Sequence, residues 1–301
     1  MSNMEKYKYI DCHSHPQDIW YKKENINSDE ILENLASDGG ATIAIGTDYE
    51  NSLQAINLAK KHENVWATIG IHPADNHAEV YSEEKFQELL NLGGEKVVGI
   101  GECGLDYFYF KSDFEKKIKA DPEFKLTYDE YVEQHKTRQR GVFISQIEFA
   151  AKNNLPLVLH GRPSKNSMDA YRDILDILET LPAWQGDSSP CQAGRLRGHA
   201  HFFVGNLEIA KRFLDLGFLM SYDGPITFTK EYDEVIKFLP IEKIMIETDS
   251  PYAAPSPHRG EINYPVYVKH VAEKIAELKN LSLAEVLEIT KNNTIKLFEL
   301  K

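Results

Sequence analysis

Cysteine and long apolar runs are both scarce in this sequence. Its three cysteines, Cys12, Cys103 and Cys191, are too few for a disulfide framework, so we expect a reducing, cytoplasmic compartment. No stretch approaches the roughly 18 consecutive apolar residues that span a bilayer, so no membrane association is expected. The N-terminal residues, MSNMEKYKYIDCHSHP, lack the basic and then apolar pattern of a secretory signal. These absences argue against a disulfide-stabilised secreted protein and against a membrane protein.

Positive charge is scarce as well. The chain carries 34 Lys and Arg against 47 Asp and Glu, a formal net charge of −13. Such an acidic surface argues against broad electrostatic attachment to nucleic acid. The net charge does not exclude a nucleic-acid enzyme whose positive charge is concentrated in bound metal ions. Because 42% of the residues are hydrophobic, the chain is expected to fold rather than stay disordered.

No linker rich in Gly, Ser or Pro divides the chain, and no repeat of solenoid length recurs. Instead, short apolar runs alternate with stretches of helical pattern. The apolar runs cover residues 9–11, 42–46, 65–71, 96–101, 155–159, 198–203, 217–221 and 243–247. The helical stretches cover residues 28–35, 52–61, 82–91, 141–153, 167–180, 207–216, 231–238 and 282–298. Eight such units in one undivided chain predict an α/β fold, a closed (β/α)₈ TIM barrel, with a doubly wound open sheet as the alternative.

Two segments break this alternation. Residues 110–136 are strongly charged, and residues 183–197 carry Gly, Pro, Ser and a cysteine. We interpret both as loop insertions on a single domain spanning residues 1–301, because surface loops tolerate added length. Each segment adjoins a strand that carries candidate ligands, so a lid over a site is the alternative interpretation.

Histidines and acidic residues gather where the predicted strands end. In a (β/α)₈ barrel these ends form one face, and active sites are built there. Side chains distant in sequence are therefore expected to converge on one pocket. The residues concerned are His13, His15, His72, Glu102, His160, His199, His201 and Asp249.

The spacing of these residues predicts which way they point. His13 and His15 are two apart, so on a strand both imidazoles face one point, while Cys12 is expected to face the helix layer as a buried thiol. His199 and His201 also share a face, and periodicity does not choose between them. Glu247 and Asp249 present the same choice, with Asp249 nearer the strand end and Glu247 a layer deeper.

The mixed nitrogen and oxygen ligand set suits Zn²⁺, Mn²⁺ or another first-row divalent ion rather than Ca²⁺. The two carboxylate oxygens of Glu102 could bridge a pair of such ions, which would activate a water as nucleophile. Arg162 follows His160 by two residues and could face the same cavity as an anion contact, or form a surface ion pair.

Motifs along nearly the whole chain, apart from the two insertions, resemble those of the TatD-like metal-dependent deoxyribonucleases, a family of amidohydrolase-type barrels. The motif ETDSPY at 247–252 is the most specific, and it continues to Arg259, Gly260 and Asn263. The sequence departs from the family pattern at Tyr264, where an acidic residue is usual, and at 202–204, where Phe-Phe-Val predicts a tighter second metal pocket. The other motifs are DCHSH (11–15), GIHP (70–73), GIGECGLDY (99–107), LPLVLHGR (155–162) and HFFVG (201–205).

The resemblance implies hydrolysis of phosphodiester bonds in DNA, as an exonuclease on single-stranded ends, by a water that two divalent ions (Zn, Mn or Mg) activate. The resemblance favours His201 over His199, and Asp249 over Glu247, as metal ligands. It implies that Asp249 takes the proton of the water, that His72 contacts phosphate or the leaving group, and that Arg162 and Arg259 bind phosphate. The implied metal ligands are His13, His15, Glu102 and Asp249 for one ion, and Glu102, His160 and His201 for the other.

Three other functions remain open on the sequence. The same site could hydrolyse a small amide, lactone or phosphoester, since a fold does not determine a substrate. A phosphoesterase of the polymerase-and-histidinol-phosphatase type also begins with His-x-His, but the ETDSP motif argues against it. A non-catalytic barrel is the third, and the complete ligand set argues against it. No obligate protein partner is evident.

Overall fold

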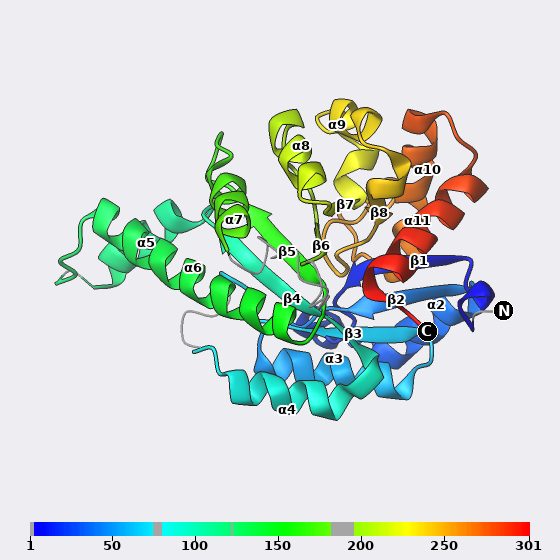
Figure 1. Cartoon of the computed structure of the whole chain (residues 1–301), viewed down its shortest axis with the longest axis horizontal. Coiled ribbons are helices and arrows are strands. Elements are labelled where there is room, and N and C mark those ends of the chain that lie inside the picture. Colours follow the sequence, from blue (N-terminus) through cyan, green and yellow to red (C-terminus); the bar gives the residue numbers. More distant parts are fainter. Residues whose placement is uncertain (1–2, 75–79, 122, 182–195) are drawn as a thin grey trace, which may run out of the picture.

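The computed structural model describes residues 3–74, 80–121, 123–181 and 196–301, and its centre is a barrel of parallel strands (Figure 1). Each strand pairs with the next strand of the sequence. A parallel bridge between Ser14 and Ser250 joins the first strand to the segment that follows the last one. The strands are β1 (Tyr9–Ser14), β2 (Gly40–Ala44), β3 (Val65–Ile69), β4 (Val97–Asp106), β5 (Leu157–Arg162), β6 (Gly198–Ala200), β7 (Leu219–Tyr222) and β8 (Ile244–Ile246).

This strand order confirms the (β/α)₈ barrel and excludes the doubly wound sheet, in which the strand order reverses within an open sheet. Helices surround the strands (Figure 1). They are α1 (Ile19–Lys23), α2 (Ser28–Ser37), α3 (Tyr49–Lys61), α4 (Glu83–Gly93), α5 (Phe110–Ala120), α6 (Tyr128–Lys152), α7 (Asp169–Thr180), α8 (Leu207–Asp215), α9 (Asp233–Phe238), α10 (Val268–Lys279) and α11 (Leu283–Phe298). Short 3₁₀ turns are η1 (Asn3–Lys6), η2 (Gly94–Lys96), η3 (Gly224–Thr227), η4 (Ile241–Lys243) and η5 (Pro265–Tyr267). Within the described parts of the chain, none of the helices is both long and apolar enough to cross a bilayer.

Apolar side chains of the strands alternate between two buried clusters, as the period of two along a strand requires. On β5, Leu157 and Leu159 belong to the cluster between strands and helices, whereas Val158 belongs to the cluster inside the barrel. This interior cluster fills the barrel below its mouth. It includes Ile10, Ile43, Val98, Val158 and Met245 of the strands, together with Leu297 and Phe298 of α11.

The first expected insertion is helical, so its interpretation as a loop is wrong. Residues 110–120 form α5 and residues 128–136 form the first turns of α6, and these helices project to one side of the barrel (Figure 1). A capping box starts α6, because the Thr127 side chain accepts from the Glu130 amide while the Glu130 carboxylate accepts from the Thr127 amide. Of the second expected insertion, residues 183–197, only 196–197 lie within the described residues.

Candidate metal centre at the mouth of the barrel

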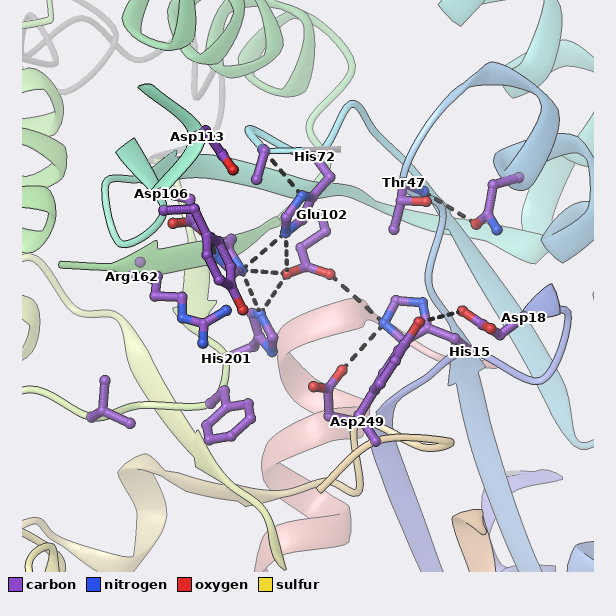
Figure 2. Close-up of a pocket in the computed structure, with 18 of the residues that line it drawn as sticks. His15, Asp18, Thr47, His72, Glu102, Asp106, Asp113, Arg162, His201 and Asp249 are labelled. Atoms are coloured by element: carbon purple, nitrogen blue, oxygen red, sulfur yellow. Dashed lines mark hydrogen bonds and ion pairs between the residues drawn. The ribbon is translucent and has the colours of Figure 1, made fainter. Parts of the chain in front are cut away.

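Most of the expected site residues line a cavity of 780 Å³ at the carboxyl ends of the strands (Figure 2). His15, Glu102, His160, His201 and Asp249 contribute to its wall, and His13 lies fully buried next to them. Asp113 and Lys116 of α5 also line the cavity, so the segment 110–136 borders the site.

Glu102 stands at the centre of this group, where its two carboxylate oxygens face different partners (Figure 2). Oε2 lies 3.4 Å from His13 Nε2 and 3.7 Å from His15 Nε2. Oε1 lies 2.6 Å from both His160 Nδ1 and His201 Nε2. The carboxylate therefore joins two sets of imidazoles, one on each side.

The first set has the dimensions of a metal site. Asp249 Oδ1 lies 3.4 Å from His13 Nε2 and 3.2 Å from His15 Nε2, and the two imidazole nitrogens are 3.1 Å apart. Two nitrogen or oxygen ligands of one tetrahedral Zn²⁺ stand roughly 3.3–3.5 Å apart, given bond lengths of about 2.0–2.1 Å. These four side chains thus fit a first-row divalent ion with little movement.

The second set is held closer together by hydrogen bonds. His160 Nδ1 and His201 Nε2 are 3.3 Å apart, and both are in contact with Glu102 Oε1. His72 Nε2 lies 3.3 Å from His160 Nδ1 and 3.5 Å from Glu102 Oε1. An ion in this position would separate the carboxylate from the imidazoles and replace their shared protons.

Burial and neighbouring charges shift the pKa values of these carboxylates in opposite directions. Burial alone would raise the pKa of Asp249, but the hydrogen bonds from His13 and His15 outweigh it and keep the pKa below its usual value. Burial would likewise raise the pKa of Glu102, yet the charges of the surrounding histidines lower it well below the usual value. Both carboxylates are therefore ionised at neutral pH, which is the form that binds metal ions.

His160 shows the complementary effect. Burial alone would lower its pKa, but hydrogen bonds to Asp106 and Glu102 outweigh the burial and raise the pKa to about 9. Without a metal ion the imidazole is thus protonated at neutral pH, and an ion has to displace that proton.

Sequence reasoning gave no role to Asp106, which the structure places directly behind His160. Its Oδ2 accepts a hydrogen bond from His160 Nε2 at 3.1 Å, so the other ring nitrogen, Nδ1, faces Glu102 and the cavity. Carboxylates that orient a metal-binding imidazole in this way are common in metal sites. The signal in the sequence was the period of two along β4, which puts Asp106 on the same face as Glu102.

The three expected substrate contacts lie in different surroundings. His72 lines the cavity, and its Nδ1 accepts from the Ala74 amide, which directs Nε2 toward Glu102. Arg162 also lines the cavity, stacked on two aromatic rings. Arg259 stands on the Phe228 ring at 4.3 Å and is exposed, outside the described residues that line the cavity.

The period of two left two choices open, one between His199 and His201 and one between Glu247 and Asp249. The members of each pair occupy two levels of the barrel. His201 and Asp249 lie in the upper group around Glu102, whereas His199 and Glu247 are fully buried beneath it. Cys12 joins this lower level inside the barrel, so its expected orientation toward the helix layer is wrong. The reason is a shift of register in β1 between Asp11 and Ser14, which turns neighbouring side chains toward the interior together.

Comparison with known families gives one description for nearly the whole chain. A family model described as "TatD related DNase" matches residues 10–299. The "Uncharacterized metal-dependent hydrolase YabD" of Bacillus subtilis is 33% identical over 97% of this chain and 99% of its own length. The "Uncharacterized metal-dependent hydrolase YcfH" of Escherichia coli is 31% identical, covering 97% of this chain and 96% of its own.

Solved structures agree with the fold. YjjV, a TatD homologue from Escherichia coli, superimposes with a TM-score of 0.75 at 25% identity, over 98% of this chain and 99% of its own. A hydrolase TatD family protein from Entamoeba histolytica has a TM-score of 0.74 at 20% identity, over 98% and 99% of the two chains. The second likeness, at this lower identity, supports the barrel alone.

Proposed function

The chain belongs to the TatD related DNase family of metal-dependent hydrolases, and from this premise we propose that it hydrolyses phosphodiester bonds in DNA, as an exonuclease on single-stranded ends. The observation that carries the proposal is the division of the Glu102 oxygens between two sets of imidazoles. A single carboxylate shared in this way is the arrangement expected for a pair of divalent ions, as in many phosphodiester-cleaving sites.

In this proposal His13, His15, Glu102 and Asp249 hold one ion, and Glu102, His160 and His201 hold the other. Zn²⁺, Mn²⁺ and Mg²⁺ are the candidates, and the imidazole-rich donor set favours the first two. When bound, the ions supply a water of lowered pKa and positive charge near the phosphate.

The side chains of the protein then accept and donate protons and position the phosphate. The ionised Asp249 carboxylate at the cavity wall orients the attacking water and accepts its proton. His72 directs Nε2 into the cavity, where an N–H can donate to a phosphate or leaving-group oxygen. Arg162 offers a planar pair of donors that suits phosphate oxygens.

The rim of the cavity supports a single-stranded substrate. Phe108 and Tyr109 are 43% and 42% exposed, and the Arg162 guanidinium stands 4.4 and 4.7 Å from their ring centroids. Aromatic rings of this kind stack on unpaired bases, and an arginine beside them reaches the backbone. An acidic protein with local basic contacts suits an end better than a wrapped duplex.

A panel of substrates tests the proposal. Protein loaded in turn with Zn²⁺, Mn²⁺ or Mg²⁺ is offered single-stranded, blunt duplex and recessed DNA oligomers, RNA, and small phosphate and carboxylate esters. We expect stepwise shortening of single-stranded DNA from one end, faster than any other cleavage. Uniform inactivity on DNA with turnover of a small ester would contradict the nuclease assignment.

Hydrolysis of a small molecule is the second candidate, because the cavity of 780 Å³ lies within the range of roughly 300–1,000 Å³ typical of small-ligand sites. The ester arm of the same panel measures it.

A cytoplasmic location belongs to the proposal as well, and free, buried Cys12 and Cys103 support a reducing compartment.

Replacing the exposed ring of Phe108 should weaken binding of single-stranded DNA. Loss of one stacked base is worth about 1–3 kcal/mol, so the Phe108→Ala variant is expected to raise the Kd about 5- to 150-fold. Fluorescence anisotropy of a labelled oligonucleotide, in an Asp249→Asn background that slows turnover, measures the change. Phe238→Ala is the matched control, since Phe238 is about equally exposed (44%) but packs with Lys211, whereas Phe108 packs with Arg162, which lines the cavity. Equal Kd values for the two variants would contradict a stacking role.

Replacing Asp106 with asparagine should weaken metal binding at His160. The amide can still accept from His160 Nε2, but it lacks the negative charge that makes the imidazole a stronger ligand and stabilises its metal-bound form. Such changes behind a ligand cost roughly 10- to 100-fold in metal affinity. Isothermal titration of metal-free protein should show one of two binding steps weakened, with the other unchanged. Two unchanged steps would mean that Asp106 has no part in holding the metal ligand.

Metal affinity should rise with pH. The pKa of His160 is raised to about 9 in the metal-free protein, so below that pH the imidazole carries a proton that binding must release. Each proton released on binding strengthens the apparent affinity about tenfold per pH unit, and the contribution of His160 levels off at pH ~9. Titrations with Zn²⁺ at a series of pH values, in buffers of different ionisation enthalpy, measure both the slope and the proton release. An affinity independent of pH between 6 and 9 would contradict the assignment of His160 as a ligand.

A further inference from the structure

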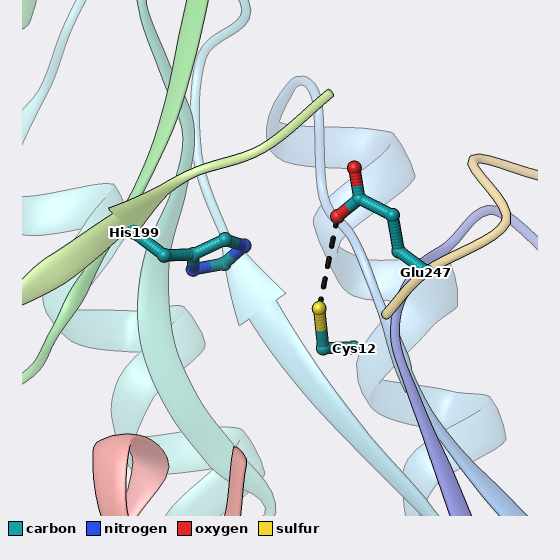
Figure 3. A group of neighbouring side chains, drawn as sticks. All are labelled: Cys12, His199 and Glu247. Carbon is teal, nitrogen blue, oxygen red and sulfur yellow. Dashed lines mark hydrogen bonds between the residues drawn. The ribbon is translucent and has the colours of Figure 1, made fainter. Parts of the chain in front are cut away.

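A second group of metal-binding side chains lies inside the barrel, below the mouth. Cys12 of β1, His199 of β6 and Glu247, which follows β8, point toward one another (Figure 3). All three are fully buried. Nothing in the proposed hydrolysis uses Cys12 or His199, although each is a side chain that proteins use to bind metal ions.

His199 is the anomalous member of this group. Both of its ring nitrogens, Nδ1 and Nε2, are buried and have no hydrogen-bond partner in the described part of the chain. An imidazole without partners in an apolar interior costs free energy, and buried polar groups are normally satisfied by protein, water or an ion. Its ring is directed at the thiol and the carboxylate, so the missing partner belongs between them (Figure 3).

The distances fit one shared ion. Cys12 Sγ and Glu247 Oε2 are 3.6 Å apart. A thiolate and a carboxylate oxygen on one tetrahedral Zn²⁺ stand about 3.5 Å apart, given bond lengths of about 2.3 and 2.0 Å. One ligand atom from each of the three residues lies within 4.8 Å of the others, so the three side chains are close enough to reach one ion.

Glu247 is already held in a suitable position. The Ser221 hydroxyl donates to its Oε2 at 2.6 Å, and the Phe202 amide donates to its Oε1 at 2.5 Å. Hydrogen bonds of this kind fix the orientation of a ligating carboxylate. A divalent ion would also be neutralised by one thiolate and one carboxylate, so no net charge would be buried.

We propose that Cys12, His199 and Glu247 bind a third divalent ion, of the thiolate-accepting class to which Zn²⁺ belongs, as a structural site inside the barrel. Binding releases the thiol proton and forms one metal–sulfur, one metal–nitrogen and one metal–oxygen bond. The ion satisfies His199 and ties together β1, β6 and β8. The sulfur ligand distinguishes this site from the group at the mouth, whose ligands are nitrogen and oxygen.

Cobalt substitution tests the proposal through that sulfur ligand. The full chain is produced in minimal medium with Co²⁺, and bound cobalt per chain is counted together with the near-ultraviolet absorption that only thiolate-bound cobalt gives. We expect the thiolate band, and one equivalent of cobalt more in the wild-type protein than in Cys12→Ser. X-ray absorption of the zinc-loaded wild type should show a sulfur neighbour at about 2.3 Å. This last measurement needs no variant, so a folding defect of Cys12→Ser would not affect it.

Matched variants identify the source of the signal. Cys103→Ser removes the other described cysteine, which is equally buried but contacts backbone carbonyls, and Cys191→Ser removes the third one. Both should retain the band and the metal count, whereas His199→Gln should shift the band or lose it. A wild-type protein without a sulfur neighbour, or a band that depends on Cys103 or Cys191, overturns the proposal and leaves a buried water as the partner of His199.

Discussion

Replacing Glu102 with glutamine is expected to lower kcat/KM by at least ~10³-fold and to remove both metal ions, because one carboxylate serves both sets of ligands. Glutamine has a single carbonyl oxygen, so it can face only one set. Its amide nitrogen would then face the other set of imidazoles, which requires a negatively charged oxygen or a metal ion as its partner. The same change removes the negative charge of Glu102, which raises the pKa of His201 and His160. The hydrogen bonds from the protonated imidazoles to residue 102 are therefore lost or weakened in the metal-free protein.

The measurement is metal content after dialysis, together with hydrolysis of single-stranded DNA at increasing metal concentration. Asp223→Asn is the matched control. Asp223 is also buried, and burial raises its pKa well above the usual value, so replacing its carboxyl group with an amide should disturb the local charge less than the change at Glu102. We expect the control to keep its metal ions. If Glu102→Gln retained two equivalents and its activity, Glu102 would not be the shared ligand.

The positions of the strands could be predicted because strands that are buried on both faces of a parallel barrel form nearly continuous apolar runs. Each expected run overlaps one of the eight strands. The helices were less predictable. α5 carries many charges and few apolar residues, so it resembles a loop, and α10 was missed because it adds a second helix to the last unit of the barrel.

The composition of the mouth could be predicted for a similar reason. A charged or imidazole side chain at the end of an apolar strand requires a partner, and the barrel brings all such ends together. What the sequence could not reveal depends on side-chain rotation and strand register. The inward position of Cys12 is the clearest example, since it follows from a single irregularity in β1.

Replacing Asp249 with asparagine separates its two proposed roles. The amide oxygen can still face His13 and His15, so metal ions should remain bound when they are supplied in excess. It cannot accept a proton, and loss of a general base costs about 10²- to 10⁴-fold in rate. We therefore expect kcat to fall by that factor while metal content at saturation is unchanged.

The comparison with Glu247→Gln makes this test specific to Asp249. Both acids belong to the same ETDSPY motif, but only Asp249 lines the cavity, while Glu247 is fully buried beneath it. A carboxylate that cannot reach the attacking water cannot take the proton of that water, so the loss of kcat should be smaller for Glu247→Gln. Hydrolysis of several DNA substrates by Asp249→Asn at the wild-type rate would show that the proton goes elsewhere. Asp249 would then be a metal ligand alone, and the base would have to be sought among the remaining groups of the cavity wall, of which His72 is the first candidate.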